Sequence, residues 1–182
     1  MIITEGKQVE DVIARISWWV TTIALSNKIS YQDINKQSES FALELLNLIY
    51  DLKMLDLNDE KTNFPGLDIG DATAKIAFQI TSRTDTAKVI GTLGKVIKYK
   101  HEQRFPNGIR FLILRDGEKI SFKTDKSDPT KILSTFDESK DIIYPSDLIA
   151  AIKKLYHADH ARFLLIIYQL LKEYLAVYDL MP

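Results

Sequence analysis

The segment from Leu67 to Thr81 constrains the fold of this chain more than any other stretch of the sequence. It contains two short runs, 67–71 and 76–81, in which apolar residues alternate with polar or small ones. Alternation with a period of two is typical of β-strands that bury one face. Only the four residues 72–75 separate the runs, so we expect them to pair antiparallel as a hairpin.

The apolar residues also predict the register of this hairpin. Pairing Asp71 with Ile76 collects apolar side chains on one face and places Asp68 opposite Gln79. A slip of one residue would scramble both faces, so the apolar pattern favours this register. The predicted apolar face holds Leu67, Ile69, Phe78 and Ile80. The predicted polar face holds Asp68, Gly70, Ala77, Gln79 and Thr81.

This register has a chemical consequence at Asp68 and Gln79. Directly opposed residues on one face of a sheet have converging side chains. The small residues Gly70 and Ala77 leave room for a ligand beside them. Carboxylate and amide oxygens suit a hard cation such as Mg²⁺ or Mn²⁺, and Mg²⁺ commonly takes only one or two protein ligands. We therefore expect Asp68 and Gln79 to hold one divalent cation.

The rest of the chain predicts one α/β domain over residues 1–182. Apolar residues at helical spacing indicate five helices, over about 7–27, 30–55, 84–97, 148–156 and 159–178. Gly91 and Gly94 inside the third helix suggest that it packs closely on a sheet. The apolar run Ile109 to Leu114 predicts a buried strand, and Asp116-Gly117 predicts a tight turn into another strand over 119–122.

Composition excludes several classes of protein. Lys plus Arg number 24 and Asp plus Glu number 25, so a nucleic-acid partner would need a local basic patch. The chain has no cysteine, which excludes disulfides, thiolate zinc sites and cysteine nucleophiles. Neither a signal-peptide pattern nor an apolar run long enough for a bilayer occurs. We expect a soluble, cytoplasmic protein without a membrane partner.

Basic residues near the hairpin are candidate contacts for DNA or RNA. The four predicted contacts are Lys75, Arg83, Lys88 and Lys95. They extend towards a cluster at the end of the third helix, which includes Lys98, Lys100, His101 and Arg104. One interpretation is contact with the phosphate backbone. The other is a solvent-exposed helix end, where positive charge suits the helix dipole.

Two apolar features point to a second chain. Trp18 and Trp19 lie about 100° apart on a helix, so we expect one in the core and the other at an interface. Segment 161–171 is apolar on nearly all sides, as in a helix buried on several sides. It either forms the centre of the core or packs against another subunit. We therefore expect either a homodimer or another protein partner, with packing entirely within one chain as the alternative.

The quoted motifs resemble a known family. Leu46 to Tyr50, Pro65 to Asp71 and Ile76 to Ser82 resemble the bacterial SMEK domain, over roughly residues 8 to 115. The pattern Gly-x-Asp, a short turn and hydrophobic-x-Gln-x-Thr is also similar to the core of the PD-(D/E)xK restriction-endonuclease-like superfamily. The resemblance implies a restriction-endonuclease-like core over 41–115, with a short mixed sheet flanked by helices. Helical additions would follow at the N-terminus and, over 145–180, at the C-terminus.

The resemblance also implies roles for four residues and a place in prokaryotic defence. The metal-binding Asp of the superfamily falls on Asp68, its second acidic position on Gln79 and its catalytic Lys on Thr81. Glu44, on the helix before the sheet, would complete the site. Such sites use Mg²⁺ or Mn²⁺ to cleave phosphodiesters.

Thr81 leaves two functions open, because it carries no charge to stabilise a phosphate in the transition state. The first is a metal-dependent nuclease. The second is a degenerate nuclease-fold module for binding, sensing or assembly, which works as a homodimer or in a larger complex.

Overall fold

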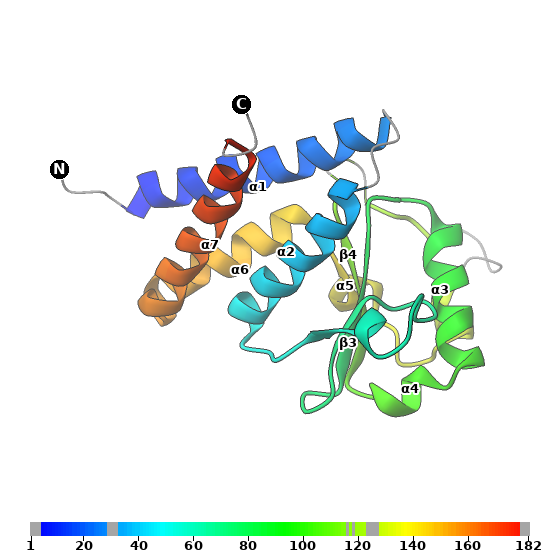
Figure 1. The fold of residues 1–182 in the computed structure, drawn as a ribbon. Helices are drawn as coiled ribbons and strands as arrows, with labels where there is room; N and C mark the ends of the chain where they lie inside the picture. The colour runs from blue at the N-terminus through cyan, green and yellow to red at the C-terminus, as the bar shows by residue number, and fades with distance from the viewer. Residues whose placement is uncertain (1–4, 29–32, 116, 118, 123–127, 179–182) are drawn as a thin grey trace. The chain divides into compact units, whose positions relative to one another are not determined.

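The computed structural model describes residues 5–28, 33–115, 117, 119–122 and 128–178 (Figure 1). The chain divides into two compact units. We call Met1–Asp51 with Pro145–Pro182 the helical unit, and Leu52–Tyr144 the sheet unit. Each is described by itself, and the expectation of a single domain over residues 1–182 stays a prediction.

The helical unit packs four helices against one another. They are α1 (Glu5–Lys28), α2 (Asp33–Tyr50), α6 (Pro145–Ala158) and α7 (His160–Tyr178). The helix that we expected to reach residue 55 ends at Tyr50, because Asp51 adopts a left-handed conformation with φ 54°. No helix in the described ranges is long and apolar enough to cross a membrane.

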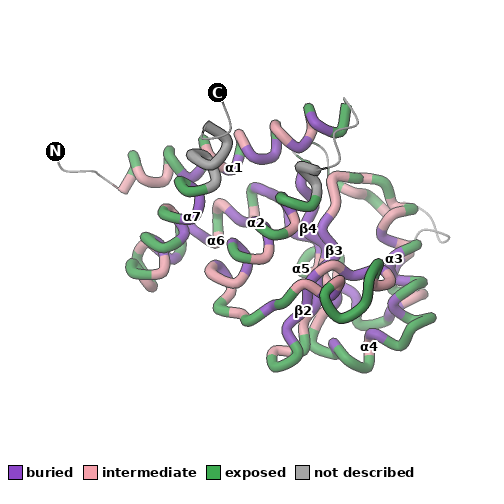
Figure 2. Tube along the Cα trace, viewed as in Figure 1, coloured by how far each residue is buried: buried purple, intermediate pink, exposed green. Residues whose placement is uncertain are grey.

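The core of this unit follows the helical periodicity of the sequence. Buried residues line the inner side of each helix, as the purple segments of Figure 2 show. Trp19 is buried and its ring meets that of Phe41 edge-on, with centroids 4.7 Å apart. Trp18 is half-buried. Trp19 is therefore the core member of the pair.

The sheet unit carries a mixed sheet of five strands in the order β1-β2-β3-β4-β5. The first three strands pair antiparallel, and β3, β4 and β5 pair parallel. Helices flank this sheet, so the predicted α/β class with a short mixed sheet is confirmed. The strands are β1 (Leu55–Asp56), β2 (Ile69–Asp71), β3 (Ile76–Thr81), β4 (Gly108–Ile113) and β5 (Ile142–Ile143). The helices are η1 (Leu57–Asp59), α3 (Thr86–Lys98), α4 (His101–Arg104), η3 (Pro129–Lys131) and α5 (Glu138–Asp141).

The β2–β3 hairpin has the register that the apolar residues predict. Ile69 pairs with Phe78 and Asp71 pairs with Ile76. The Asp71 carboxylate holds the turn, because its Oδ1 accepts hydrogen bonds of 2.8 Å from the backbone N–H groups of both Thr73 and Ala74. Its Oδ2 accepts a third, of 2.6 Å, from the backbone N–H of Lys53.

One face of the sheet is covered by α3, which begins where the sequence predicts. Asp85 caps the helix by accepting a 2.9 Å hydrogen bond from the Lys88 N–H. The apolar residues Val89, Leu93 and Val96 belong to the same buried cluster as Ala77 of β3. Leu67 joins this cluster instead of the predicted opposite face, because it precedes β2 and strand alternation does not extend to it.

Two expectations about neighbouring segments are wrong. Gly91 and Gly94 do not allow close packing of α3, because both are exposed and an added Cβ would meet nothing within 4 Å. Residues 119–122 form no strand. The Ile120 N–H donates instead to the Tyr144 hydroxyl at 2.8 Å, which takes this backbone out of any ladder. Asp116 of the predicted turn lies outside the described residues.

Candidate active site

Asp68 and Gln79 meet on the face of the sheet that α3 covers. The side-chain amide nitrogen of Gln79 donates a hydrogen bond to Oδ2 of Asp68. The backbone N–H of Ile80 donates to the same oxygen at 2.6 Å. Gln79 is only 6% exposed, and its amide nitrogen also donates to the Ile80 carbonyl at 3.0 Å. The hairpin therefore fixes an acid and a carboxamide in contact.

The environment of Asp68 favours its neutral form. Burial raises the pKa of its carboxyl to about 6, against the opposing effects of the Ile80 hydrogen bond and the positive charge of Lys88. The negative charge of Asp56 raises this pKa further. A carboxyl group whose pKa is raised this far by burial, close to a positively charged side chain such as Lys88, is typical of functional sites.

Lys88 supplies that cation from α3. It is the third residue of the helix and is half-buried. Burial lowers the pKa of its ammonium group, and the Asp68 carboxylate opposes that effect. The positive charges of Lys95 and Arg83 lower the same pKa, so these two basic residues also lie near Lys88.

The four predicted nucleic-acid contacts therefore separate into two places. Arg83, Lys88 and Lys95 follow the C-terminal end of β3, and the charges of Arg83 and Lys95 both act on Lys88. The Arg83 guanidinium is bound to both carboxylate oxygens of Asp85, at 2.8 Å each. Lys75 is exposed in the turn before β3, at the opposite end of that strand.

Thr81 and Glu44 have separate settings. Thr81 is the last residue of β3, and its hydroxyl accepts a 3.1 Å hydrogen bond from the Arg83 N–H. Glu44 lies on α2 in the helical unit, where its carboxylate accepts a hydrogen bond from the Gln169 side chain. The geometry within the sheet unit thus comprises Asp68, Gln79 and Thr81, with Lys88.

Sequence reasoning missed two features of this site. It did not place Lys88 beside the acid, because the position of a helix over a sheet depends on packing. It also did not identify Asp56, which lies just after the predicted second helix, as part of a strand. Asp56 forms β1 opposite Ile69 and caps η1 by accepting a 2.8 Å hydrogen bond from the Asn58 N–H. The signal was the Asp-x-Asn spacing, which is typical of a capped turn.

The donor types at the site suit a hard cation. Asp68 offers carboxylate oxygens and Gln79 offers one amide oxygen once its amide group turns, because its nitrogen faces Asp68. Two protein ligands with water completing the shell are common for Mg²⁺. Among the described residues, no three His, Cys, Asp or Glu side chains form a metal-binding group. The residues present therefore fit Mg²⁺ or Mn²⁺ better than a metal that needs a full protein cage.

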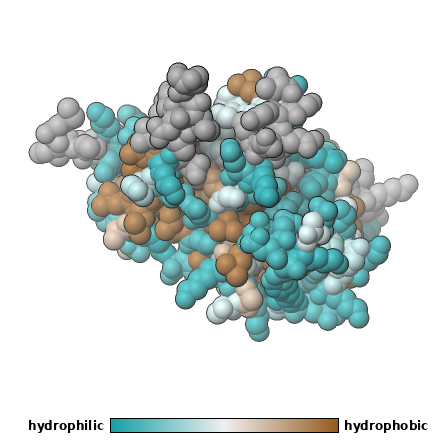
Figure 3. Space-filling model, in the orientation of Figure 1, coloured by the Kyte–Doolittle hydropathy of each residue, from teal (hydrophilic) through white to brown (hydrophobic). Residues whose placement is uncertain are grey.

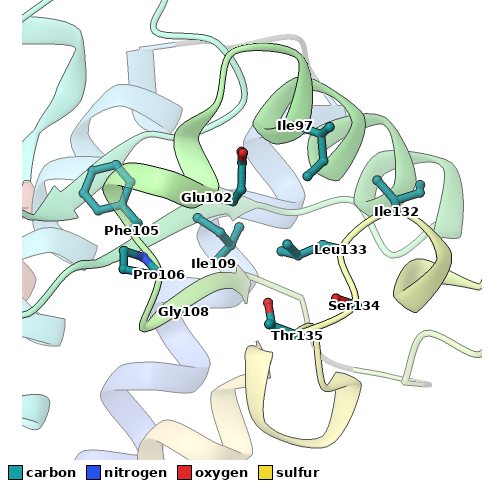
Figure 4. A pocket seen from close by; sticks show the side chains of 10 residues that line it. All are labelled: Ile97, Glu102, Phe105, Pro106, Gly108, Ile109, Ile132, Leu133, Ser134 and Thr135. Atoms are coloured by element: carbon teal, nitrogen blue, oxygen red, sulfur yellow. The ribbon is translucent and has the colours of Figure 1, made fainter.

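A hollow elsewhere in the sheet unit does not include these residues. It has a volume of about 350 Å³ and lies beside α4, the start of β4 and the segment after η3 (Figure 4). Its wall is mostly apolar, with Glu102, Ser134 and Thr135 as polar members. None of the predicted site residues lines it.

Fold and site define an α/β protein with a mixed sheet, in which the buried carboxyl group of Asp68 lies close to Lys88 in the first turn of α3. The family model of the SMEK domain matches residues 11–153, so the chain belongs to the SMEK domain family. The match extends beyond the motifs that suggested the family, through β4 and β5 and into α6. No curated protein and no solved structure matches the chain.

Proposed function

We propose that this protein is a nuclease of the PD-(D/E)xK restriction-endonuclease-like type, which cleaves nucleic acid with Mg²⁺ or Mn²⁺. One observation carries the proposal: the buried carboxyl group of Asp68 contacts Gln79 and lies within the electrostatic influence of Lys88. This combination provides an oxygen ligand for a cation and a positive charge for a phosphate in one place.

Lys88 takes over the electrostatic role that Thr81 cannot fill. In the proposed site its ammonium group lies beside the phosphate oxygens and stabilises the negative charge that develops on them. Partial burial strengthens this effect, because charges interact more strongly away from bulk water. The Thr81 hydroxyl donates a hydrogen bond to the attacking water or to a phosphate oxygen.

Asp68 and Gln79 position the cation through their oxygens in this proposal. When bound, the cation acts as a Lewis acid and activates water for attack on phosphorus. Asp68 is held in place by the Ile80 N–H, which binds Oδ2, so Oδ1 is the oxygen that would hold the cation. Gln79 contributes its amide oxygen after rotation of the amide group.

A cleavage assay tests the proposal. Labelled DNA and RNA, single-stranded and duplex, are incubated with the full chain and Mg²⁺ or Mn²⁺. We expect cleavage that chelation stops, that Asp68→Asn abolishes and that Lys88→Met strongly reduces. Lys153→Met removes an exposed lysine of α6 and serves as the matched control with unchanged activity. Failure to cleave any of these substrates would overturn the proposal.

A second candidate function is a non-catalytic module that works as a homodimer in prokaryotic defence. Figure 3 shows hydrophobic atoms, in brown, gathered on the helical unit. On α7 an uncharged stripe is exposed at helical spacing, and the same stripe on a second copy would match it in chemistry. Its members are Leu164, Leu165, Tyr168 and Leu171, exposed by 45%, 54%, 65% and 37%. Sedimentation analysis tests this: a dimer that Leu165→Lys dissociates supports the module, and a monomer at all concentrations contradicts it.

A further inference from the structure

Three aromatic rings stack near the junction between α3 and α4. The rings of Phe64 and His101 lie with centroids 4.6 Å apart and planes 23° apart. The ring of Tyr99 continues the stack over His101, at 6.0 Å and 19°. His101 is buried, whereas Tyr99 is 46% exposed. Tyr99 is therefore the most exposed ring of a stack in which His101 is buried and Phe64 is half-buried.

The backbone between α3 and α4 produces this arrangement. Lys100 adopts a left-handed conformation with φ 60°, and this reverses the chain between Tyr99 and His101. His101 is also held by a hydrogen bond to the backbone carbonyl of Pro65. The platform beneath Tyr99 is thus fixed before any ligand arrives, which lowers the entropy that binding must overcome.

Basic side chains surround the exposed ring. The Lys98 ammonium nitrogen lies over the Tyr99 ring, 5.5 Å from its centroid, so a base that stacks on this face would displace it towards the phosphates. Lys95 and Lys100 are exposed nearby in sequence. Two acids lie near the stack: Glu60 is bound by the Arg104 guanidinium at 2.6 and 2.7 Å, and Glu102 of α4 acts on His101 through its charge. Positive charge therefore predominates around a flat, exposed aromatic surface.

The same helix links this ring to the candidate active site. Lys88 and Lys95 are spaced by seven residues, so they lie on one side of α3, and Tyr99, four residues after Lys95, caps the end of this helix. Lys95 is close enough to Lys88 to lower its pKa. A polyanion that follows this side of the helix would pass from Asp68 and Lys88 towards the exposed ring.

We propose that Tyr99 is a stacking platform for an unpaired base of single-stranded DNA or RNA, whose phosphates contact Lys95, Lys98 and Lys100. This inference deepens the proposed function and rests on it, because it assumes a nucleic-acid ligand and names its single-stranded form. An exposed aromatic ring within a basic surface is the arrangement that binds single strands with little sequence preference. A base within a duplex cannot offer its face in this way, because it is stacked between its neighbours.

Binding of short labelled oligonucleotides, measured by fluorescence anisotropy with chelator present, tests the inference. The probes are oligothymidylate, oligouridylate and an abasic DNA strand of the same length and charge. We expect the full chain to bind at least one of the base-bearing strands about tenfold more tightly than the abasic strand. Equal affinity for all three would overturn the inference, because only stacking distinguishes them.

Variants separate stacking from charge. Tyr99→Leu should weaken binding of base-bearing strands by about five- to a hundred-fold and leave abasic binding unchanged. Tyr99→Trp keeps a large aromatic face and should bind at least as tightly as the wild type. Leu25→Ala removes an apolar side chain that is 57% exposed on α1 of the helical unit and should change nothing. Wild-type affinity in Tyr99→Leu would contradict the inference.

The two proposals can fail separately. If binding depends on Tyr99 while no strand is cleaved with any metal, the nuclease proposal fails and the stacking site stands. If Asp68-dependent cleavage occurs while Tyr99→Leu changes neither affinity nor cleavage at low substrate, the stacking site fails alone.

Discussion

The ammonium group of Lys88, near the start of α3, stabilises the ionised carboxylate of Asp68, which directly precedes β2. Burial raises the pKa of the Asp68 carboxyl to about 6, and the charge of Lys88 limits that rise. Burial lowers the pKa of Lys88, and Asp68 limits that fall. The acid and the ammonium group that acts on it therefore come from different elements of the sheet unit.

The raised pKa of Asp68 predicts how the free energy of unfolding depends on pH. In the folded chain Asp68 keeps its proton to a higher pH than its usual value of 3.8 allows in the unfolded chain. Stability is therefore lost as the pH rises from about 4 through about 6, by up to about 3 kcal/mol from this one group. Asp68→Asn cannot ionise and should become more stable relative to the wild type over that range.

Urea unfolding of both proteins at pH 4 and pH 8 measures this difference. Only the change between the two pH values is predicted, so the effect of weaker hydrogen bonds in the Asn variant cancels. A stability difference between Asp68→Asn and the wild type that is the same at both pH values would show that Asp68 titrates normally.

For the proposed nuclease, Lys88→Met should reduce the cleavage rate about 100- to 1000-fold, because it removes the positive charge that the proposal places beside the phosphate. It should also raise the pKa of Asp68 further, so any remaining activity should require a higher pH. Rates measured across pH with saturating Mn²⁺ check both effects. Lys95→Met is the control, with a much smaller effect on the rate at saturating substrate, and equal losses in the two variants would argue against a special role for Lys88.

Gly70→Ala should destabilise the protein by about 1–3 kcal/mol. A Cβ at Gly70 would lie 2.9 Å from two ring carbons of Phe105, which is itself buried. Gly94→Ala is the matched control in the same unit. Its Cβ would meet nothing within 4 Å, and alanine favours a helix by up to about 1 kcal/mol, so it should stabilise. Denaturant unfolding should therefore shift in opposite directions for the two variants.

Asp71→Ala should lower the free energy of unfolding by about 2–4 kcal/mol, because the buried carboxylate accepts three backbone hydrogen bonds. Two of them hold the β2–β3 turn and the third holds the backbone at Lys53. Asp128→Ala removes a comparable but exposed cap, that of η3, and should cost much less. Thermal unfolding at neutral pH compares the two. Similar losses of stability in both variants would contradict the conclusion that the Asp71 carboxylate holds the hairpin.

The sequence predicts the hairpin well, because one apolar face determines its register. Asp68 and Gln79 could be placed together for that reason alone. The sequence did not predict β1 and β5, because each strand has two residues. An alternation of apolar and polar residues cannot be recognised over so short a segment. The Lys88 charge beside Asp68 depends on how α3 lies on the sheet, and no local pattern contains that information.

The central claim is that Asp68 and Gln79 form a cation site, and a crystal structure of the full chain soaked with Mn²⁺ tests it most directly. Anomalous scattering identifies the ion without reference to any activity. We expect a Mn²⁺ peak at direct ligand distance from an Asp68 carboxylate oxygen, with the Gln79 amide turned so that its oxygen faces the ion. An intact Gln79 N–H···Asp68 hydrogen bond at saturating Mn²⁺, with no ion peak beside it, would contradict the account.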